Sequence, residues 1–158
     1  VMATKEFELD KNTTYGENEK KLSLEGASLL IQSLKNIEND NQKFINQDNS
    51  KATYAKKIDK NETKINWNGD AYKVLAHIHG LSPSPGAWFE FKNERFRVLK
   101  AKIFSQNGKS GSVLDENLTI GCSSSSIQIL EIQRQGKNIQ TSKDFLLGKK
   151  INKGEILK

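Results

Sequence analysis

The first fifty residues combine one short alternating segment with one long amphipathic segment. Polar and apolar residues alternate over residues 5–9, the period-two pattern of a half-buried β-strand. Thr14 and Glu17 have the spacing of a capping box, which predicts a helix beginning there. Small and apolar residues then recur at steps of three and four: Leu22, Gly26, Leu29, Leu30, Leu34 and Ile37. One strand and one helix cannot bury such a stripe alone, so residues 1–40 are predicted to end a larger α/β domain.

A polar stretch separates this segment from the rest of the chain. Residues 41–64 carry no apolar periodicity and are predicted to be a linker that becomes basic from Lys51 onward. A second helix should follow, with Asn68 or Asp70 as its N-cap and Gly80 at its end. Its apolar face is Ala71, Val74, Leu75 and Ile78. The only two prolines, in the segment 82–86, predict an extended and turning entry into the next element.

From Ala87 onward the pattern is that of β-strands. Phe89 and Phe91 alternate with polar residues, a turn is predicted at Asn93 and Glu94, and Phe96 and Val98 share the next apolar face. The apolar phase then shifts by one residue, to Leu99, Ala101 and Ile103, and it shifts again between Ile129 and Leu130. Such shifts are typical of β-bulges, which help a small sheet to curl. Further short strands are predicted around 112–114 and 118–120, and Ser142 should cap a last helix that ends at Gly148.

These elements predict an α+β fold. Residues 65–158 should form a small OB-like open β-barrel with flanking helices, preceded by the strand and helix of the other domain.

Charge divides the chain at the same place. Residues 1–50 carry a net charge of −3 and residues 51–158 a net charge of +9, although the whole chain is only +6. A basic half is a candidate for contact with a polyanion, because clustered Lys and Arg release counterions from phosphates. The alternative is a Lys-rich solvated surface. The candidates for contact with a phosphate backbone are Lys56, Lys57, Lys60, Lys64, Arg95, Arg97, Lys100, Lys102, Arg134, Lys137 and Lys143.

The remaining motifs offer no catalytic or metal site. His77 and His79 are two residues apart, so on a helix they point in different directions, and they are predicted to be surface or interface histidines. Cys122 precedes four serines and is predicted to be a strand-end residue beside a flexible turn. No apolar run is long enough for a membrane span and no secretory leader is seen, so a cytoplasmic protein is expected. Because the chain starts at Val1 without an initiator Met, we expect an internal piece of a longer protein.

Several segments resemble methionyl-tRNA formyltransferases. They are residues 52–58, residues 64–67, the run from Ile78 to Trp88, and the closing residues 135–155 with Lys143-Asp144-Phe145-Leu146-Leu147-Gly148. The resemblance covers essentially the whole chain. Asn66, His79, Ser82 and Ser84 depart from the residues usual in the family, and the family has a permanent cation, Arg, where His79 stands.

The resemblance implies a bacterial enzyme of translation initiation. Such enzymes transfer a formyl group from 10-formyltetrahydrofolate to the amino group of methionyl initiator tRNA, without a metal. The catalytic Asn, His and Asp lie in a Rossmann-like domain and are expected upstream of Val1, so this chain alone should be inactive. Residues 1–40 would end that catalytic domain, 41–64 would be the linker, and 65–158 would bind tRNA. The parent enzyme is expected to be monomeric, and the isolated chain to self-associate through Leu22, Leu30 and Leu34.

Two other classes remain open. Sugar-nucleotide formyltransferases and formyl-folate hydrolase domains share the two-domain plan but act on small molecules and need no basic barrel. A free-standing basic OB-type RNA-binding domain would not account for the strand and helix before residue 40. The charge asymmetry and the ending from Lys143 to Gly148 favour the tRNA enzyme.

Overall fold

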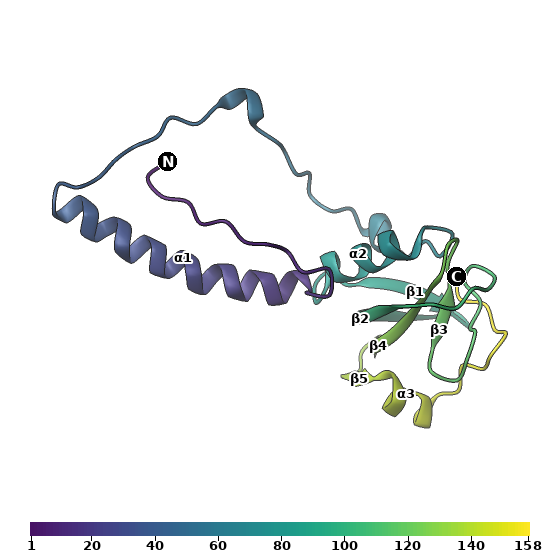
Figure 1. The fold of residues 1–158 in the computed structure, drawn as a ribbon. Helices are drawn as coiled ribbons and strands as arrows, with labels where there is room; N and C mark the ends of the chain where they lie inside the picture. Colours follow the sequence, from purple (N-terminus) through teal and green to yellow (C-terminus); the bar gives the residue numbers. More distant parts are fainter. The chain divides into compact units, whose positions relative to one another are not determined.

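The structure is a computed structural model that describes residues 1–158 as two compact units. The first unit comprises residues 1–10 and 17–57, and the second comprises residues 11–16 and 58–158. Helix α1 (Tyr15–Glu38) and the short 3-10 helix η1 (Asn49–Lys51) belong mainly or wholly to the first unit. All the strands and the remaining helices belong to the second unit (Figure 1).

In the first unit the predicted helix is confirmed and the predicted strand is wrong. Helix α1 begins directly after Thr14, as expected, and buries none of its side chains. Residues 5–9 are extended but form no strand, because no neighbouring strand is there to pair with them. They lie along α1 instead: Lys5 forms an ion pair with Glu25, and the ammonium groups of Lys5 and Lys21 lie over the Phe7 ring. The predicted remnant of a Rossmann-like domain is therefore not confirmed.

The second unit is an antiparallel sheet of five strands with three helical segments. The strands are β1 (Ala87–Phe91), β2 (Glu94–Phe104), β3 (Thr119–Gly121), β4 (Ser126–Arg134) and β5 (Ile139–Thr141). Their order is β1-β2-β4-β3, and β5 also pairs with β4. The helical segments are η2 (Lys60–Thr63), α2 (Ala71–Leu81) and α3 (Ser142–Gly148). The α+β class is confirmed. Residues 112–114 are not a strand, however, and β5 was not predicted.

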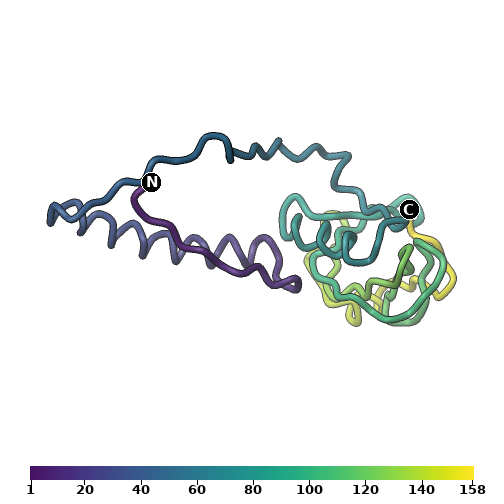
Figure 2. Tube along the Cα trace, turned by 45° about the horizontal axis from the view of Figure 1, so that its top comes forward, coloured from purple at the N-terminus to yellow at the C-terminus, as the bar shows by residue number.

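The sheet is not closed, so the predicted barrel is not observed. Its edge strands β1 and β3 do not pair with each other, and irregular segments lie along both edges. Val113 forms an isolated bridge with Ile120 of β3, and Lys158 exchanges both backbone hydrogen bonds with Glu90 of β1, at 2.6 and 2.9 Å. A longer strand around residue 113 is prevented by a turn, in which the Asp115 carboxylate accepts the backbone N–H groups of Asn117 and Thr119. The chain ends within this unit (Figure 2).

Local chemistry explains the limits of α2 and of the first hairpin. Asp70 is the N-cap of α2, with its carboxylate accepting the Tyr72 N–H at 2.8 Å. The helix ends at Leu81, one residue beyond the predicted Gly80. The β1–β2 turn consists of Lys92 and Asn93, both with positive φ, one residue earlier than predicted. A two-residue hairpin turn matches the twist of its strands when both central residues have positive φ, as these two do.

The two predicted phase shifts are confirmed, and they lie opposite each other. Val98 pairs with Ile132 and Ala101 pairs with Ile129, so each strand has two residues between these pairs. Leu99 of β2 and Leu130 of β4 are left without a partner, while Lys100 still pairs with Glu131. The register after the irregularity is therefore the same as before it.

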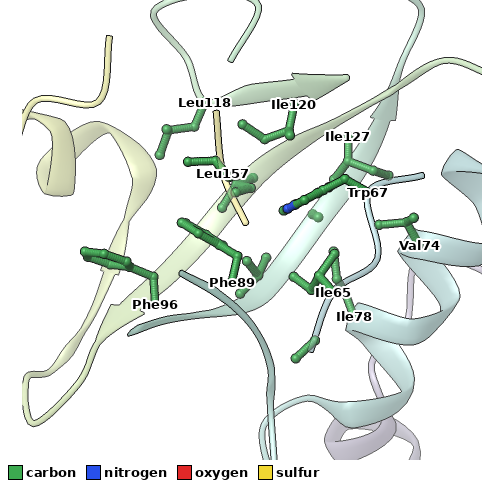
Figure 3. Packing of buried hydrophobic residues seen from close by; sticks show 14 of the residues in the cluster. Ile65, Trp67, Val74, Ile78, Phe89, Phe96, Leu118, Ile120, Ile127 and Leu157 are labelled. Atoms are coloured by element: carbon green, nitrogen blue, oxygen red, sulfur yellow. The ribbon is translucent and has the colours of Figure 1, made fainter. Parts of the chain in front are cut away.

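The core lies between α2 and the inner face of the sheet (Figure 3). The rings of Phe89 and Phe96 stack with centroids 5.5 Å apart, and Trp67 lies 6.1 Å from Phe89. Because Phe89 and Phe96 face inward, the residues next to them in β1 and β2 project from the opposite face. That face carries Trp88, Arg95 and Arg97.

Candidate nucleic-acid interface

A hollow of about 560 Å³ lies on the outer face of β1 and β2. Its walls are η2, the loop of residues 84–86 and the β4–β5 turn at Gln135 and Gly136, and its floor includes Trp88. Four of the predicted cations, Lys60, Arg95, Arg97 and Lys137, border it, together with the amides of Gln133 and Gln135. The fold thus gathers side chains from four separate parts of the sequence into one basic hollow.

Trp88 is held in this hollow by its own hydrogen bond and by two cations. Its Nε1–H donates to Thr63 Oγ1 at 2.9 Å, which ties the indole to η2. The Arg95 guanidinium carbon lies 3.7 Å from the ring centroid, and Lys64 Nζ lies 5.4 Å from it. Cations at these distances are attracted by the ring quadrupole. Sequence reasoning did not select Trp88, although its alternation with Ala87 and Phe89 already placed it on the face of the arginines.

Arg97 is occupied by the protein itself. Its Nη2 donates to the carbonyl oxygens of Pro83 and Pro85, both at 2.6 Å, and its Nη1 donates to Gln133 Oε1 at 2.9 Å. Its Nε is buried without a hydrogen-bond partner and packs beside Gly86. This arginine therefore fixes the proline loop to the sheet, and its Nη donors are directed at the protein.

Gly86 is the position that allows this arrangement. Its φ is +85°, a conformation that side chains other than glycine rarely adopt. A Cβ at this position would lie 2.5 Å from Nε and 2.7 Å from Nη2 of Arg97. Only glycine lets the backbone approach the guanidinium so closely.

Gln133 extends the same network to the other wall. Besides accepting from Arg97, its Nε2 donates to the carbonyl oxygen of Lys137 at 2.8 Å. The turn between β4 and β5 is thereby tied to the floor, with Gly136 at φ +72°. The proline loop and this turn, on two sides of the hollow, are thus linked through one Arg–Gln pair.

The other predicted cations lie elsewhere. Arg134 and Lys149 both pair with Glu94, with N–O distances of 2.7 and 2.6 Å, and these cations, Lys149 first, hold the pKa of Glu94 below its usual range. Lys143 borders a second hollow beside α3. Lys102 is exposed on β2 opposite Gln128, and Lys100 is half-buried opposite Glu131. Lys56 and Lys57 belong to the first unit, while Lys64 joins the hollow through Trp88.

The histidines and the cysteine have structural surroundings. His79 is buried, contrary to the prediction of a surface or interface histidine: the Ala101 N–H donates to its Nε2 at 3.3 Å, and its Nδ1 lies 3.2 Å from the Lys11 carbonyl oxygen. Both ring nitrogens are thus used inside the fold. Cys122 directly follows β3, and burial, with a contribution from Asp70, raises the pKa of its thiol to about 11. No group of three or more His, Cys, Asp or Glu residues is arranged to hold a metal ion.

The sequence matches one known family. The profile described as "Formyl transferase, C-terminal domain" matches residues 57–150. Curated relatives named methionyl-tRNA formyltransferase include that of Pelagibacter ubique, 45% identical over 85% of this chain and 44% of the relative. The relative from Agrobacterium fabrum is 39% identical over 94% of this chain and 49% of its own length. The chain thus spans about half the length of the curated relatives that it matches.

Solved structures of low sequence identity share the fold. A variant of HypX from Aquifex aeolicus matches with a TM-score of 0.70 and 18% identity, over 89% of this chain and 27% of HypX. HypX in complex with tetrahydrofolic acid matches with a TM-score of 0.60 and 21% identity, over 74% of this chain and 22% of that protein. The described helices include none that is both long and apolar enough to span a membrane.

Proposed function

Because this chain belongs to the family of formyl transferase C-terminal domains, we propose that it is the tRNA-binding part of a methionyl-tRNA formyltransferase. The parent enzyme would transfer a formyl group from 10-formyltetrahydrofolate to the amino group of methionyl initiator tRNA, in the cytoplasm. The names of the relatives support this proposal. They favour it over a small-molecule formyltransferase or a free-standing RNA-binding domain.

The observation that carries the tRNA-binding role is the basic hollow around Trp88. Lys60, Arg95 and Lys137 border it and Lys64 lies over its indole. The one carboxylate that borders the hollow, Asp59, is engaged in capping η2, where it accepts the Asn61 N–H at 2.8 Å. A concave surface with an excess of cations attracts a phosphate backbone through counterion release.

We assign the formyl-transfer chemistry to the part of the parent enzyme outside this chain. The hollow presents cations and amides to a nucleic acid. Its only carboxylate, that of Asp59, caps η2, so the hollow contains no free general base for the methionyl amine. We place the formyl-folate site on the catalytic domain as well. Without that domain the chain is expected to bind tRNA and to transfer no formyl group.

The proposed division of the chain follows from this role. Residues 1–40 are assigned to the end of the catalytic domain, 41–64 to the linker and 65–158 to the tRNA-binding domain. On α1, Leu22, Leu30 and Leu34 are each at least half exposed. A solvated apolar face of this kind favours association, so the isolated chain should self-associate through it, whereas the parent enzyme should be monomeric. Sedimentation of the chain with all three leucines changed to Gln tests this, since the change should restore a monomer.

Binding to initiator tRNA, measured by fluorescence anisotropy at several salt concentrations, tests the proposed function. If Lys56, Lys57, Lys60, Lys64, Arg95 and Lys137 each neutralise one phosphate, affinity should fall about a thousandfold between 50 and 200 mM salt. Lys60→Gln should lower the slope of log K against log salt by about one. Lys109→Gln, an exposed position outside the hollow, is the matched control. A flat salt response, or equal effects of the two substitutions, would contradict the proposal.

A further inference from the structure

The contact between Trp88 and Arg95 has a geometry that phosphate binding alone does not require. At 3.7 Å from the ring centroid, the guanidinium carbon is at the contact distance of stacked groups. Arg95 is exposed, and its side chain has no hydrogen-bond or ion-pair partner within the protein. The guanidinium therefore lies against the indole while the exposed Arg95 side chain still borders the hollow.

The walls of the hollow are fixed before any ligand arrives. Arg97 holds the proline loop by two hydrogen bonds of 2.6 Å, and Gln133 holds the β4–β5 turn at 2.8 Å. Trp88 is fixed to η2 through Thr63. The segments that line the cavity are thus already held in place, which reduces the conformational entropy lost when a ligand binds.

The free polar groups suit a nucleotide. Lys60 and Lys137 border the hollow on the walls formed by η2 and the β4–β5 turn, where either could reach a phosphate. The side chains of Gln135 and Ser84 also border it and make no hydrogen bond within the protein. They are free to meet the edge of a base. The volume of about 560 Å³ lies within the range of small-ligand pockets.

Building on the proposed tRNA-binding role, we propose that this hollow holds one unpaired nucleotide of the RNA. Its base stacks on the open side of the Arg95 guanidinium, which is itself stacked on Trp88, and its phosphate lies near Lys60 or Lys137. Unpaired bases can be splayed out and stacked on arginine or aromatic planes, whereas a duplex keeps its bases inside and offers mainly phosphates and 2′-hydroxyls. The surface therefore recognises an unpaired position of the tRNA rather than helical phosphates alone.

Two RNA probes and one conservative substitution test the proposal. The probes are a single-stranded heptamer of mixed sequence and a hairpin duplex whose loop is a non-nucleotide linker, so that it has no unpaired base, and the two are compared at equal phosphate concentration with the full chain. Arg95→Lys keeps the charge but removes the stacking plane, so affinity for the heptamer should fall about five- to tenfold, the lower end of measured base-stacking effects. Affinity for the hairpin should change less than twofold. Arg134→Lys, the same substitution in the ion pair with Glu94 outside the hollow, should leave both affinities unchanged.

Tryptophan fluorescence provides a second readout. Trp67 is buried in the core, so quenching by added RNA reports on Trp88. The heptamer should quench the emission and the hairpin should not. If tRNA binds with the expected salt dependence but Arg95→Lys weakens neither probe selectively and no quenching is seen, the nucleotide pocket is refuted and tRNA binding stands. If the unsubstituted chain binds neither probe nor tRNA, both proposals fall.

Discussion

Replacing Arg97 with lysine should destabilise the sheet-bearing unit although the charge is kept. The guanidinium makes two hydrogen bonds of 2.6 Å to proline carbonyl oxygens and a third of 2.9 Å to Gln133. These bonds diverge from two nitrogens of a planar fork, and a single ammonium cannot reach all three acceptors. A lysine at this position therefore leaves at least one wall of the hollow unattached.

The magnitude follows from the bonds lost. A hydrogen bond to a charged group contributes about 1.5–3 kcal/mol, and the loss of two is partly offset because Arg97 is only half-buried and water can replace some contacts. We expect a net loss of about 2 kcal/mol, which lowers the folded-to-unfolded ratio roughly 30-fold. For a unit of this size the melting temperature should fall by about 8 °C.

Urea denaturation followed by circular dichroism measures this change as a lower midpoint with an unchanged slope. Arg95→Lys is the matched control, because Arg95 lies on the same face two residues away but makes no hydrogen bond to the loops. That control should cost less than about 0.5 kcal/mol. Equal midpoints for the Arg97→Lys chain and the unsubstituted chain, or equal losses for the two variants, would refute the assignment of Arg97 as a structural anchor.

Three further predictions concern other parts of the same unit. Leu157→Ala removes a buried side chain of the C-terminal tail and should lower the free energy of unfolding, measured by urea titration, by about 3 kcal/mol. A loss under about 1 kcal/mol would show that this tail is not part of the core. The pKa of Glu94 is depressed in the fold by Lys149 and Arg134, so its contribution to stability is present above the unfolded pKa and is lost as pH falls through the folded pKa. Glu94→Gln should therefore reduce the fall in the free energy of unfolding as the pH is lowered. An unchanged fall would argue against the ion pairs of Glu94 with Lys149 and Arg134. Because the pKa of Cys122 is raised to about 11, iodoacetamide at pH 8 should label the native chain far more slowly than the chain in urea, whereas equal rates would contradict its burial.

The sequence was sufficient where the signal is local. Asp70, one of the two predicted N-caps, begins α2, and the apolar phase shifts at Leu99 and Leu130 identified both irregularities of the sheet. The prediction of a strand at residues 5–9 was wrong because an alternating pattern fits a position on a sheet but does not show that a neighbouring strand is present to pair with it. The prediction of a barrel was wrong for a related reason, since alternation and phase shifts do not specify which strands pair at the edges of a sheet, and β1 and β3 do not pair here.

The candidate site was predicted in part. Arg95 and Lys60 were selected by charge, and both border the hollow. Charge alone could not separate Arg95 from Arg97, because the partners of Arg97 are backbone carbonyls 12 and 14 residues away and an amide 36 residues away. Trp88 was missed because the site residues were selected by charge alone, yet its alternation with Phe89 carried the necessary signal.

The opposed irregularity of β2 and β4 also bears on how the length of this domain can vary. A strand interior normally tolerates no deletion, because losing one residue turns every following side chain to the other face. Here each strand has one residue more than regular pairing needs, at Leu99 and at Leu130. Removing either one would leave an ordinary one-sided bulge, and removing both would leave an unbroken ladder, with Ala101 and Ile132 still facing inward. We therefore expect alignment gaps within these two strands among related domains, at a place where an insertion or deletion leaves the following residues facing the same way.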